Sequence, residues 1–189
     1  MEFLKDNSGE YDPGRKLEDF SPQFLAELAR EYAGAYLAMD GFWNGAVTRC
    51  SGMKQAMDCD LVVWRRMAKY MLPRIARLVN VDLPVQDLLE ALKVWQISPD
   101  QVTPDIYTIE YDIKDRNHVI GTVTRCATLE RFEESAPEII QTLCHGVEVA
   151  AVEAQCRVLH PEMRVTPLKL PPRRSRDEIA CQWEYRLAT

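Results

Sequence analysis

The sequence predicts an α+β fold, with helices in the N-terminal part followed by a four-stranded antiparallel sheet (ββαββ) that is backed by a long helix. Near residue 100 the spacing of apolar residues changes from three or four positions to two, which is the change from helix to strand. A further helical stretch, residues 137–160, separates two pairs of predicted strands. We therefore expect a flexible arm over residues 1–20, a helical part over 21–100 and an α+β part over 101–189, all within one compact unit.

The first helix is predicted to begin at Ser21-Pro22, because serine can cap the free amides of a helix and proline is tolerated at its first position. Apolar residues then recur at steps of three and four positions: Phe24, Leu25, Leu28, Tyr32, Ala35, Met39 and Trp43. This pattern is typical of an amphipathic helix that packs its apolar stripe against the rest of the protein. Glycines between residues 45 and 52 are expected to end the helix.

Two further helices are predicted before residue 100. Asp60 is a candidate cap for the second helix, and Pro73 is expected to kink it because proline lacks an amide hydrogen. The third helix is expected to start at Asp82-Leu83-Pro84. Prolines at positions 99 and 104 then end the helical part.

The strands are predicted from alternation. Residues 107–113 alternate between apolar and polar side chains, which predicts a strand with one buried face. A polar turn at 114–117 and a second strand over 118–129 complete a hairpin. The elements expected after this hairpin are a helix over 137–160 and closing strands over 163–170 and 179–187.

Composition excludes some classes of protein. The formal charge of −6 and the pI near 5.2 argue against a nucleic-acid partner, because binding to phosphates relies on clustered Lys and Arg. The first residues lack the features of a secretory signal, and no apolar stretch approaches the roughly 20 residues that span a bilayer, so we expect no membrane association. A cytoplasmic location follows as the expectation. In that reducing compartment the six cysteines are more plausible as free thiols or ligands than as disulfides.

Three cysteines are candidates for a common site in the last third of the chain. Cys126 ends a predicted strand, Cys144 lies in the long helix and Cys181 lies in the final strand. Cys181 alternates in phase with Trp183 and Tyr185, which places all three on one strand face. That face either packs in the core or forms the aromatic wall of a pocket for a planar ligand. We predict that the three cysteines, Trp183 and Tyr185 line such a pocket.

Arg125 is a further candidate ligand-binding residue, because its guanidinium can pair bidentately with a carboxylate. The alternative is an exposed side chain of the sheet surface. His145 follows Cys144 directly, but adjacent helical residues point about 100° apart, so this imidazole is a poor base for that thiol.

Cys156 and His160 form a candidate metal site. The two residues are four positions apart and would share one side of the helix if it persists to its end, and a thiolate with an imidazole suits zinc. Structural zinc needs four ligands, however, and the sequence has no Cys-x-x-Cys pair. The alternative is a helix-end thiol next to a solvent-facing histidine.

Several segments together resemble a known family, the L-2-amino-thiazoline-4-carboxylic acid hydrolase-like proteins, which are similar to the 4-vinyl-reductase small-molecule-binding domain. The resemblance covers about residues 105 to 187. Its segments are Arg125-Cys126, Cys144-His145-Gly146-Val147-Glu148, Leu159-His160-Pro161, Leu170-Pro171-Pro172 and Ile179-Ala180-Cys181-Gln182-Trp183-Glu184-Tyr185. The resemblance implies an antiparallel sheet backed by helices, an enclosed ligand and often a homodimer. It also implies that Cys181 takes the final position of a zinc-binding cysteine cluster, whose preceding Glu-x-x-Cys is missing here.

Three functions are compatible with these observations. The first is a small-molecule-binding protein with a cysteine-lined pocket. The second is a hydrolase that opens a small cyclic amidine or thiazoline carboxylic acid by attack of a thiolate or a metal-bound hydroxide, with Cys126, Cys144 or Cys181 as the candidate catalytic residue and Arg125 holding the substrate carboxylate. The third is a non-catalytic assembly subunit whose N-terminal helices form a dimer face.

Overall fold

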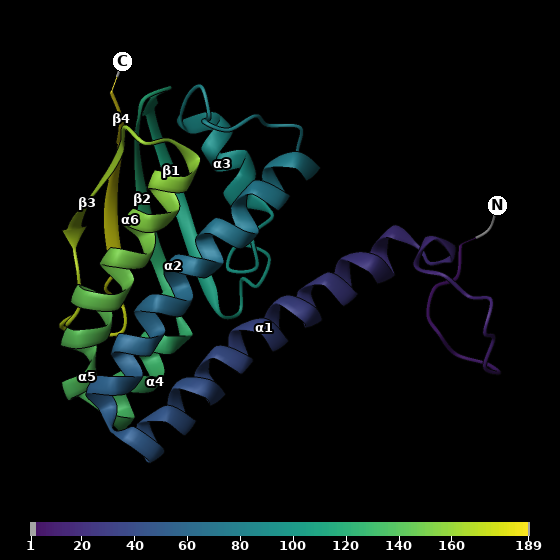
Figure 1. The fold of residues 1–189 in the computed structure, drawn as a ribbon, viewed down its shortest axis with the longest axis horizontal. Helices are drawn as coiled ribbons and strands as arrows, with labels where there is room; N and C mark the ends of the chain where they lie inside the picture. Colours follow the sequence, from purple (N-terminus) through teal and green to yellow (C-terminus); the bar gives the residue numbers. More distant parts are fainter. Residues whose placement is uncertain (1–2, 189) are drawn as a thin grey trace.

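The computed structural model describes residues 3–188 and has the predicted α+β fold (Figure 1). Its principal helices and strands are, in chain order, α1 (Pro22–Ser51), α2 (Met53–Leu78), α3 (Leu88–Gln96), β1 (Tyr107–Asp115), β2 (His118–Cys126), α4 (Ala127–Ser135), α5 (Pro137–Thr142), a five-residue π-helical segment (Leu143–Val147), α6 (Glu148–Leu159), β3 (Met163–Lys169) and β4 (Cys181–Leu187). The ββαββ order of the sheet-forming part is confirmed.

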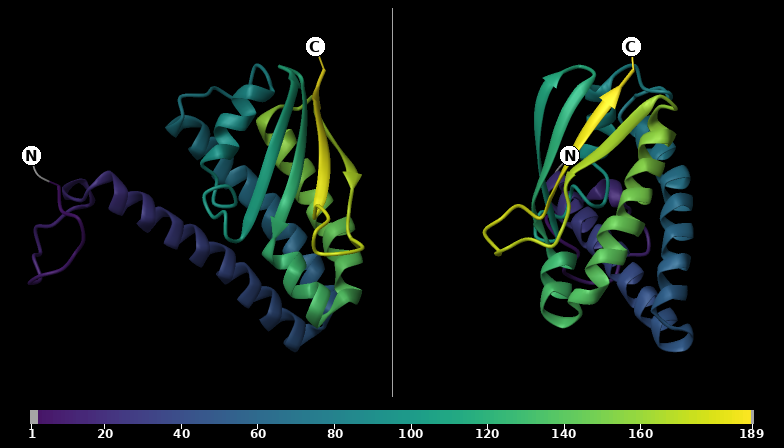
Figure 2. Two further views of the ribbon diagram at one scale, coloured as in Figure 1. Left: turned by 180° about the vertical axis from the view of Figure 1, so that it is seen from behind. Right: turned by 90° about the vertical axis from the view of Figure 1, so that its left-hand side faces the viewer.

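The four strands form one antiparallel sheet in the order β1-β2-β4-β3. The last strand of the chain therefore lies between β2 and β3, and Val119 pairs with Tyr185 while Val123 pairs with Cys181. Helices α2, α3 and α6 cover one face of this sheet, and the view from behind shows the strands in front of them (Figure 2). The fold is thus a helical layer packed on a sheet.

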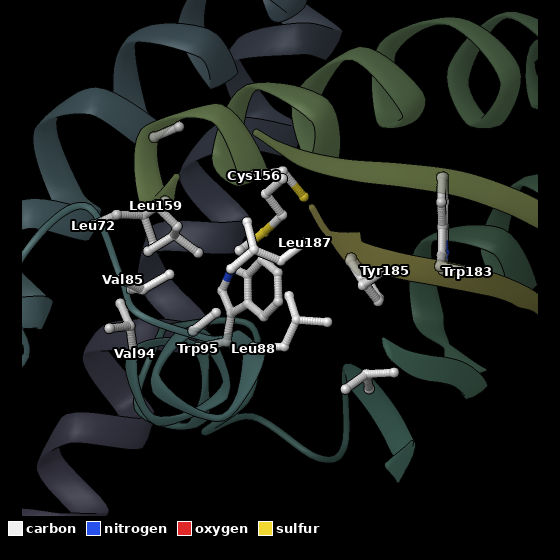
Figure 3. Packing of buried hydrophobic residues seen from close by; sticks show 14 of the residues in the cluster. Leu72, Val85, Leu88, Val94, Trp95, Cys156, Leu159, Trp183, Tyr185 and Leu187 are labelled. Carbon is white, nitrogen blue, oxygen red and sulfur yellow. The ribbon is translucent and has the colours of Figure 1, made fainter. Parts of the chain in front are cut away.

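The core lies between the sheet and these helices. Its largest fully buried side chains include Leu72 of α2, Leu88 of α3, Leu159 of α6 and Trp183 of β4, and Figure 3 shows several of them converging. Gly121 of β2 lies where a Cβ atom would come 3.0 Å from side-chain atoms of both Ile109 and Tyr185. The absence of a side chain at this position therefore lets the ring of Tyr185 approach β2 closely.

Helix α1 begins and ends where predicted but differs from the prediction in burial. It continues through the glycines at 41 and 45 and ends at Ser51, where Gly52 takes a φ of 86°, a value that suits glycine. The predicted apolar stripe faces mostly outward, since Tyr32 is 66% exposed and Met39 is 67% exposed. Figure 1 shows the N-terminal half of α1 extending away from the rest of the protein. The expectation that this stripe packs within the chain is wrong.

The starts of α2 and α3 also differ from the prediction. Because α2 begins at Met53, Asp60 lies inside that helix and is no cap. Helix α3 begins at Leu88, and its cap is Asp87, whose Oδ1 accepts a hydrogen bond of 3.0 Å from the amide of Glu90. The start predicted at Asp82-Leu83-Pro84 is therefore too early.

The second strand is shorter than predicted and the long helix is interrupted. Strand β2 ends at Cys126, whose Sγ accepts a 3.4 Å hydrogen bond from the amide of Leu129 and so begins α4. The predicted helix over 137–160 consists of α5, the π-helical segment and α6. π-Helical turns of this kind occur often at functional sites, because they turn side chains away from the regular helical spacing.

Candidate functional site

A cavity of about 210 Å³ lies between the sheet and the helices. The residues that line it come from α1, α2, α3 and the segment after it, β1, β2, α4, the π-helical segment, α6 and β4. An apolar cavity of about 150 Å³ can hold benzene, so this volume is enough for a small organic ring with one or two substituents. The fold thus brings segments from most of the chain around one space.

The structure places Cys126, Cys144 and Cys181 on the wall of this cavity. Cys126 is the last residue of β2 and Cys181 is the first residue of β4, and the pairing of these two strands brings them to the same end of the sheet. Cys144 lies in the π-helical segment. The sequence-based expectation that these cysteines share one space agrees with this geometry, while their role in ligand binding stays a prediction.

Burial and neighbouring carboxylates keep these thiols protonated. Burial raises the pKa of Cys126 to about 11, and burial together with the charge of Glu148 raises the pKa of Cys144 to about 12. Burial also raises the pKa of Cys181 to about 12. Reactive cysteines instead have pKa values lowered by cationic neighbours. At neutral pH the cavity therefore presents thiols and not thiolates.

Trp183 and Tyr185 belong both to the core and to the cavity wall. Their side chains are buried, and both residues line the cavity. Nε1 of Trp183 donates a 3.1 Å hydrogen bond to Sγ of Cys181, and the ring of Tyr185 lies 5.2 Å from that of Trp95, centroid to centroid. These contacts hold the rings in place, so one end of the cavity has a rigid aromatic wall.

Four carboxyl groups on the wall were missed in the sequence analysis: Asp40 of α1, Asp60 of α2, Asp100 and Glu148 of α6. Asp60 is 5% exposed, and its Oδ2 accepts a 3.3 Å hydrogen bond from Nδ2 of Asn44. Glu148 follows Cys144 by four positions, a spacing that could have indicated a shared helix face. Asp40, Asp60 and Asp100 carried no such signal, because their segments come together only in the folded chain.

The environment of these carboxyl groups disfavours their charged form. Burial, followed by the charges of Asp100 and Asp60, raises the pKa of Glu148 to about 7. Burial and the neighbouring Asp40 raise the pKa of Asp60 to about 7 and that of Asp100 to about 6. Burial also raises the pKa of Asp40. Near neutral pH the carboxyl groups of the cavity wall are therefore partly protonated and partly charged.

Arg125 lies outside the cavity, which contradicts its predicted place at the ligand. The side chain is exposed, and its Nη1 lies 3.5 Å from Oδ1 of Asp105. An irregularity in the pairing of β1 with β2 explains this position. Ile109 pairs with Val123 and Thr108 with Arg125, so the alternation that buries Val123 shifts at the next residue, and Arg125 turns outward while Cys126 reaches the cavity wall. Within residues 3–188, the cavity wall includes no Lys, Arg or His.

His145 does not activate a thiol. Nε2 of its ring lies 2.6 Å from the carbonyl oxygen of Pro171, at hydrogen-bonding distance, and the residue is not part of the cavity wall. The expectation that Cys144 and His145 form no nucleophilic pair agrees with this arrangement.

The predicted metal pair of Cys156 and His160 does not form a site. Cys156 is buried in the core, whereas α6 ends at Leu159 and His160 has an extended backbone with φ −156°. The imidazole Nδ1 of His160 accepts a 3.0 Å hydrogen bond from the amide of Glu162. In the described part of the chain, no group of three or more His, Cys, Asp or Glu residues is arranged to hold a metal ion. The four-residue spacing would place Cys156 and His160 on the same side of α6 only if this helix continued to His160.

Comparison with known proteins gives one match. Residues 18–187 match the model of a protein family described as a family of unknown function (DUF6125). No curated protein and no solved structure matches the chain. None of these comparisons names the thiazoline carboxylic acid hydrolase-like family or the 4-vinyl-reductase domain, so that resemblance stays a prediction. Among residues 3–188, no helix is long and apolar enough to cross a membrane.

The protonated state of the wall thiols predicts slow alkylation. With iodoacetamide at mildly alkaline pH, Cys50, which is exposed, should be modified first, and Cys126, Cys144 and Cys181 should each react at least about tenfold more slowly. The rates are measured by mass spectrometry of tryptic peptides over time. A wall cysteine that reacts as fast as Cys50 would contradict the environment described here.

The raised pKa of Glu148 predicts a pH-dependent cost in stability. A carboxyl group whose pKa is higher in the folded state destabilises the fold as pH rises from its ordinary value near 4.5 through about 7. Glu148→Gln should therefore be more stable than the wild type by about 1 to 3 kcal/mol above pH 7.5, and the difference should vanish near pH 4. Urea unfolding at several pH values measures it, with Glu153→Gln on the same helix as the matched control. Parallel pH profiles of wild type and Glu148→Gln would disprove the assignment.

Proposed function

Because the chain belongs to the DUF6125 family, whose function is unknown, we propose its function from the cavity itself: the protein binds a small organic molecule there. The observation that carries this proposal is a cavity of about 210 Å³ with thiol and aromatic walls, built from segments far apart in the sequence. Protein interiors are otherwise closely packed, so a cavity of this size favours a role in binding. Small-molecule sites are typically concave and apolar, with a few polar groups. A cytoplasmic location is part of the same proposal.

Binding has more support than hydrolysis. A thiolate nucleophile is disfavoured because burial raises the pKa of Cys126, Cys144 and Cys181. The arginine expected to hold the substrate carboxylate lies outside the cavity and pairs with Asp105. The Cys156 and His160 pair supplies no metal-bound hydroxide either, because the two residues do not converge. The proposal is therefore a binding protein without a nucleophile in its cavity.

A homodimer formed through α1 is the second part of the proposal. Along this helix, apolar residues repeat at alternating steps of three and four: Leu25, Leu28, Tyr32, Ala35, Met39, Phe42 and Ala46. This is the spacing of a coiled-coil seam. The opposite side of α1 carries Leu37 and Asp40 and faces the protein's own cavity. The seam is therefore turned outward, and Phe42 is 72% exposed on it.

Charges beside the seam favour a second copy of the chain as its partner. Glu31 and Arg49 are both exposed and lie 18 positions apart, which is five full turns, so they occupy the same side of α1. In an antiparallel symmetric pair centred near Met39, Glu31 of one chain would approach Arg49 of the other, and the reverse contact would form by symmetry. Within residues 3–188 neither side chain has an ion-pair partner.

The binding proposal predicts that a small neutral probe enters the cavity. Fluorobenzene should show line broadening in ¹⁹F NMR with the wild-type protein, and Ala151→Phe should abolish it, because Ala151 is 4% exposed on the cavity wall. Cys144→Phe is a second variant that fills the cavity, should the first fail to fold. Ala26→Phe, at an exposed position on α1, is the control that should keep the broadening. If fluorobenzene shows no line broadening with the wild-type protein, the proposal is wrong.

The dimer proposal predicts that a charge at the centre of the seam separates the copies. Light scattering after size exclusion should give twice the chain mass for the wild type and one chain mass for Met39→Glu, because two carboxylates would meet near the symmetry axis. Ala26→Glu, on another side of α1, should stay dimeric. Glu31→Arg should weaken the dimer, and adding Arg49→Glu in the same chain should restore it. A monomeric wild type would rule the dimer out.

A further inference from the structure

Two carboxyl groups on the cavity wall have no side-chain partner among the residues that the structure describes. Within residues 3–188 the side chains of Asp100 and Glu148 form no hydrogen bond and no ion pair, although both line the cavity. Both side chains are partly buried, and a charged group with reduced access to water is stabilised by a hydrogen-bond donor or an opposite charge. The carboxyl oxygens of these two residues can therefore accept hydrogen bonds from a molecule in the cavity.

Two hydroxyl groups repeat this observation independently. Ser98 is 3% exposed and Tyr185 is 5% exposed, and both line the cavity. In the described part of the chain neither hydroxyl forms a hydrogen bond to another residue. Both hydroxyl oxygens keep some accessible surface, so they are open to a ligand in the cavity. A ligand with several polar hydrogens could form hydrogen bonds with both the carboxylates and the hydroxyls.

The sign of the charge on that ligand follows from the rest of the wall. The wall carries four acidic side chains, two of which are Asp40 and Asp60, and no basic one among residues 3–188. Its aromatic residues include Trp64, Trp95 and Trp183. The faces of aromatic rings attract cations, and indole does so most strongly. An anionic ligand would meet repulsion from the carboxylates and no compensating group.

We propose that the cavity selects a small organic cation with several N–H donors, such as an amine or amidine attached to a flat apolar group, over a neutral or anionic molecule of the same shape. This inference rests on the proposed function, because it specifies the chemistry of the molecule that the cavity binds. Glu148 and Asp100 would accept hydrogen bonds from the cationic group, and the indole rings would cover its apolar part. The raised pKa of the carboxyl groups supports this assignment, since a bound cation would relieve their mutual repulsion.

A bare metal ion fits the same wall poorly. Hard divalent ions need several oxygen ligands at 2.0 to about 2.6 Å around one point. The carboxyl groups come from four separate segments, and in residues 3–188 they do not converge as such a ligand set. An organic cation can instead place its N–H groups toward carboxylates that are apart from one another.

Three probes of one shape test the inference: benzamidine, benzamide and benzoate, which are cationic, neutral and anionic. Titration calorimetry at mildly alkaline pH, where the wall carboxyl groups are ionised, should show benzamidine binding at least about tenfold more tightly than benzamide, and benzoate binding no more tightly than benzamide. Glu148→Gln should weaken benzamidine at least about fivefold and leave benzamide nearly unchanged. Glu153→Gln, on the same helix but off the wall, should leave both affinities unchanged.

The outcomes separate this inference from the proposed function. If benzamide or benzoate binds as tightly as benzamidine and Ala151→Phe blocks that binding, the cavity binds small molecules but the preference for cations is wrong. Binding of fluorobenzene without binding of benzamidine would also overturn the preference and leave the proposed function standing. If neither fluorobenzene nor any of the three probes binds, the proposed function and the inference both fail. Equal loss of benzamidine and benzamide affinity in Glu148→Gln would show a structural effect and would also overturn the role given to this carboxylate.

Discussion

The pairing of β2 with β4 is the interaction on which the rest of the structure depends. It inserts the last strand of the chain between β2 and β3 and aligns Val123 with Cys181. This register puts the end of β2 beside the start of β4 and turns Trp183 and Tyr185 toward the helices. A shift by one residue would exchange the two faces of β4, so the same register specifies both the core and the cavity.

The cavity combines rigid apolar walls with acidic groups that weaken the fold. Trp183 and Tyr185 are tightly packed, whereas Glu148 and Asp60 sit where their charged form is disfavoured and their pKa values are raised. Substitution of these acids by uncharged residues would relieve the repulsion. Natural proteins retain such unfavourable groups mainly where binding or catalysis uses them. The acids and not the cysteines therefore give the cavity its chemical character, because the thiols are neutral at the pH where the acids ionise.

Helix α1 connects the proposed binding cavity with the proposed dimer seam. Its side with Leu37 and Asp40 closes the cavity, and its other side carries the seam with Met39 and Phe42. A second copy bound at the seam would restrain α1, and with it one wall of the cavity. Dimerisation and ligand binding would then be coupled through a single helix, since an ordered wall lowers the entropic cost of binding.

Local sequence was enough to predict the fold class, the positions of most helices and strands, and the face shared by Cys181, Trp183 and Tyr185, because these depend on periodicities of two and 3.6 residues. Local sequence did not predict the exact end of α6. The helix ends at Leu159, one residue before His160, so Cys156 and His160 do not form the predicted metal pair. The packing of the folded chain determined which side of α1 faces the protein and brought Asp40, Asp60, Asp100 and Glu148 to one cavity. Their proximity arises from contacts between segments that are distant along the chain, and no local pattern of residues records such contacts.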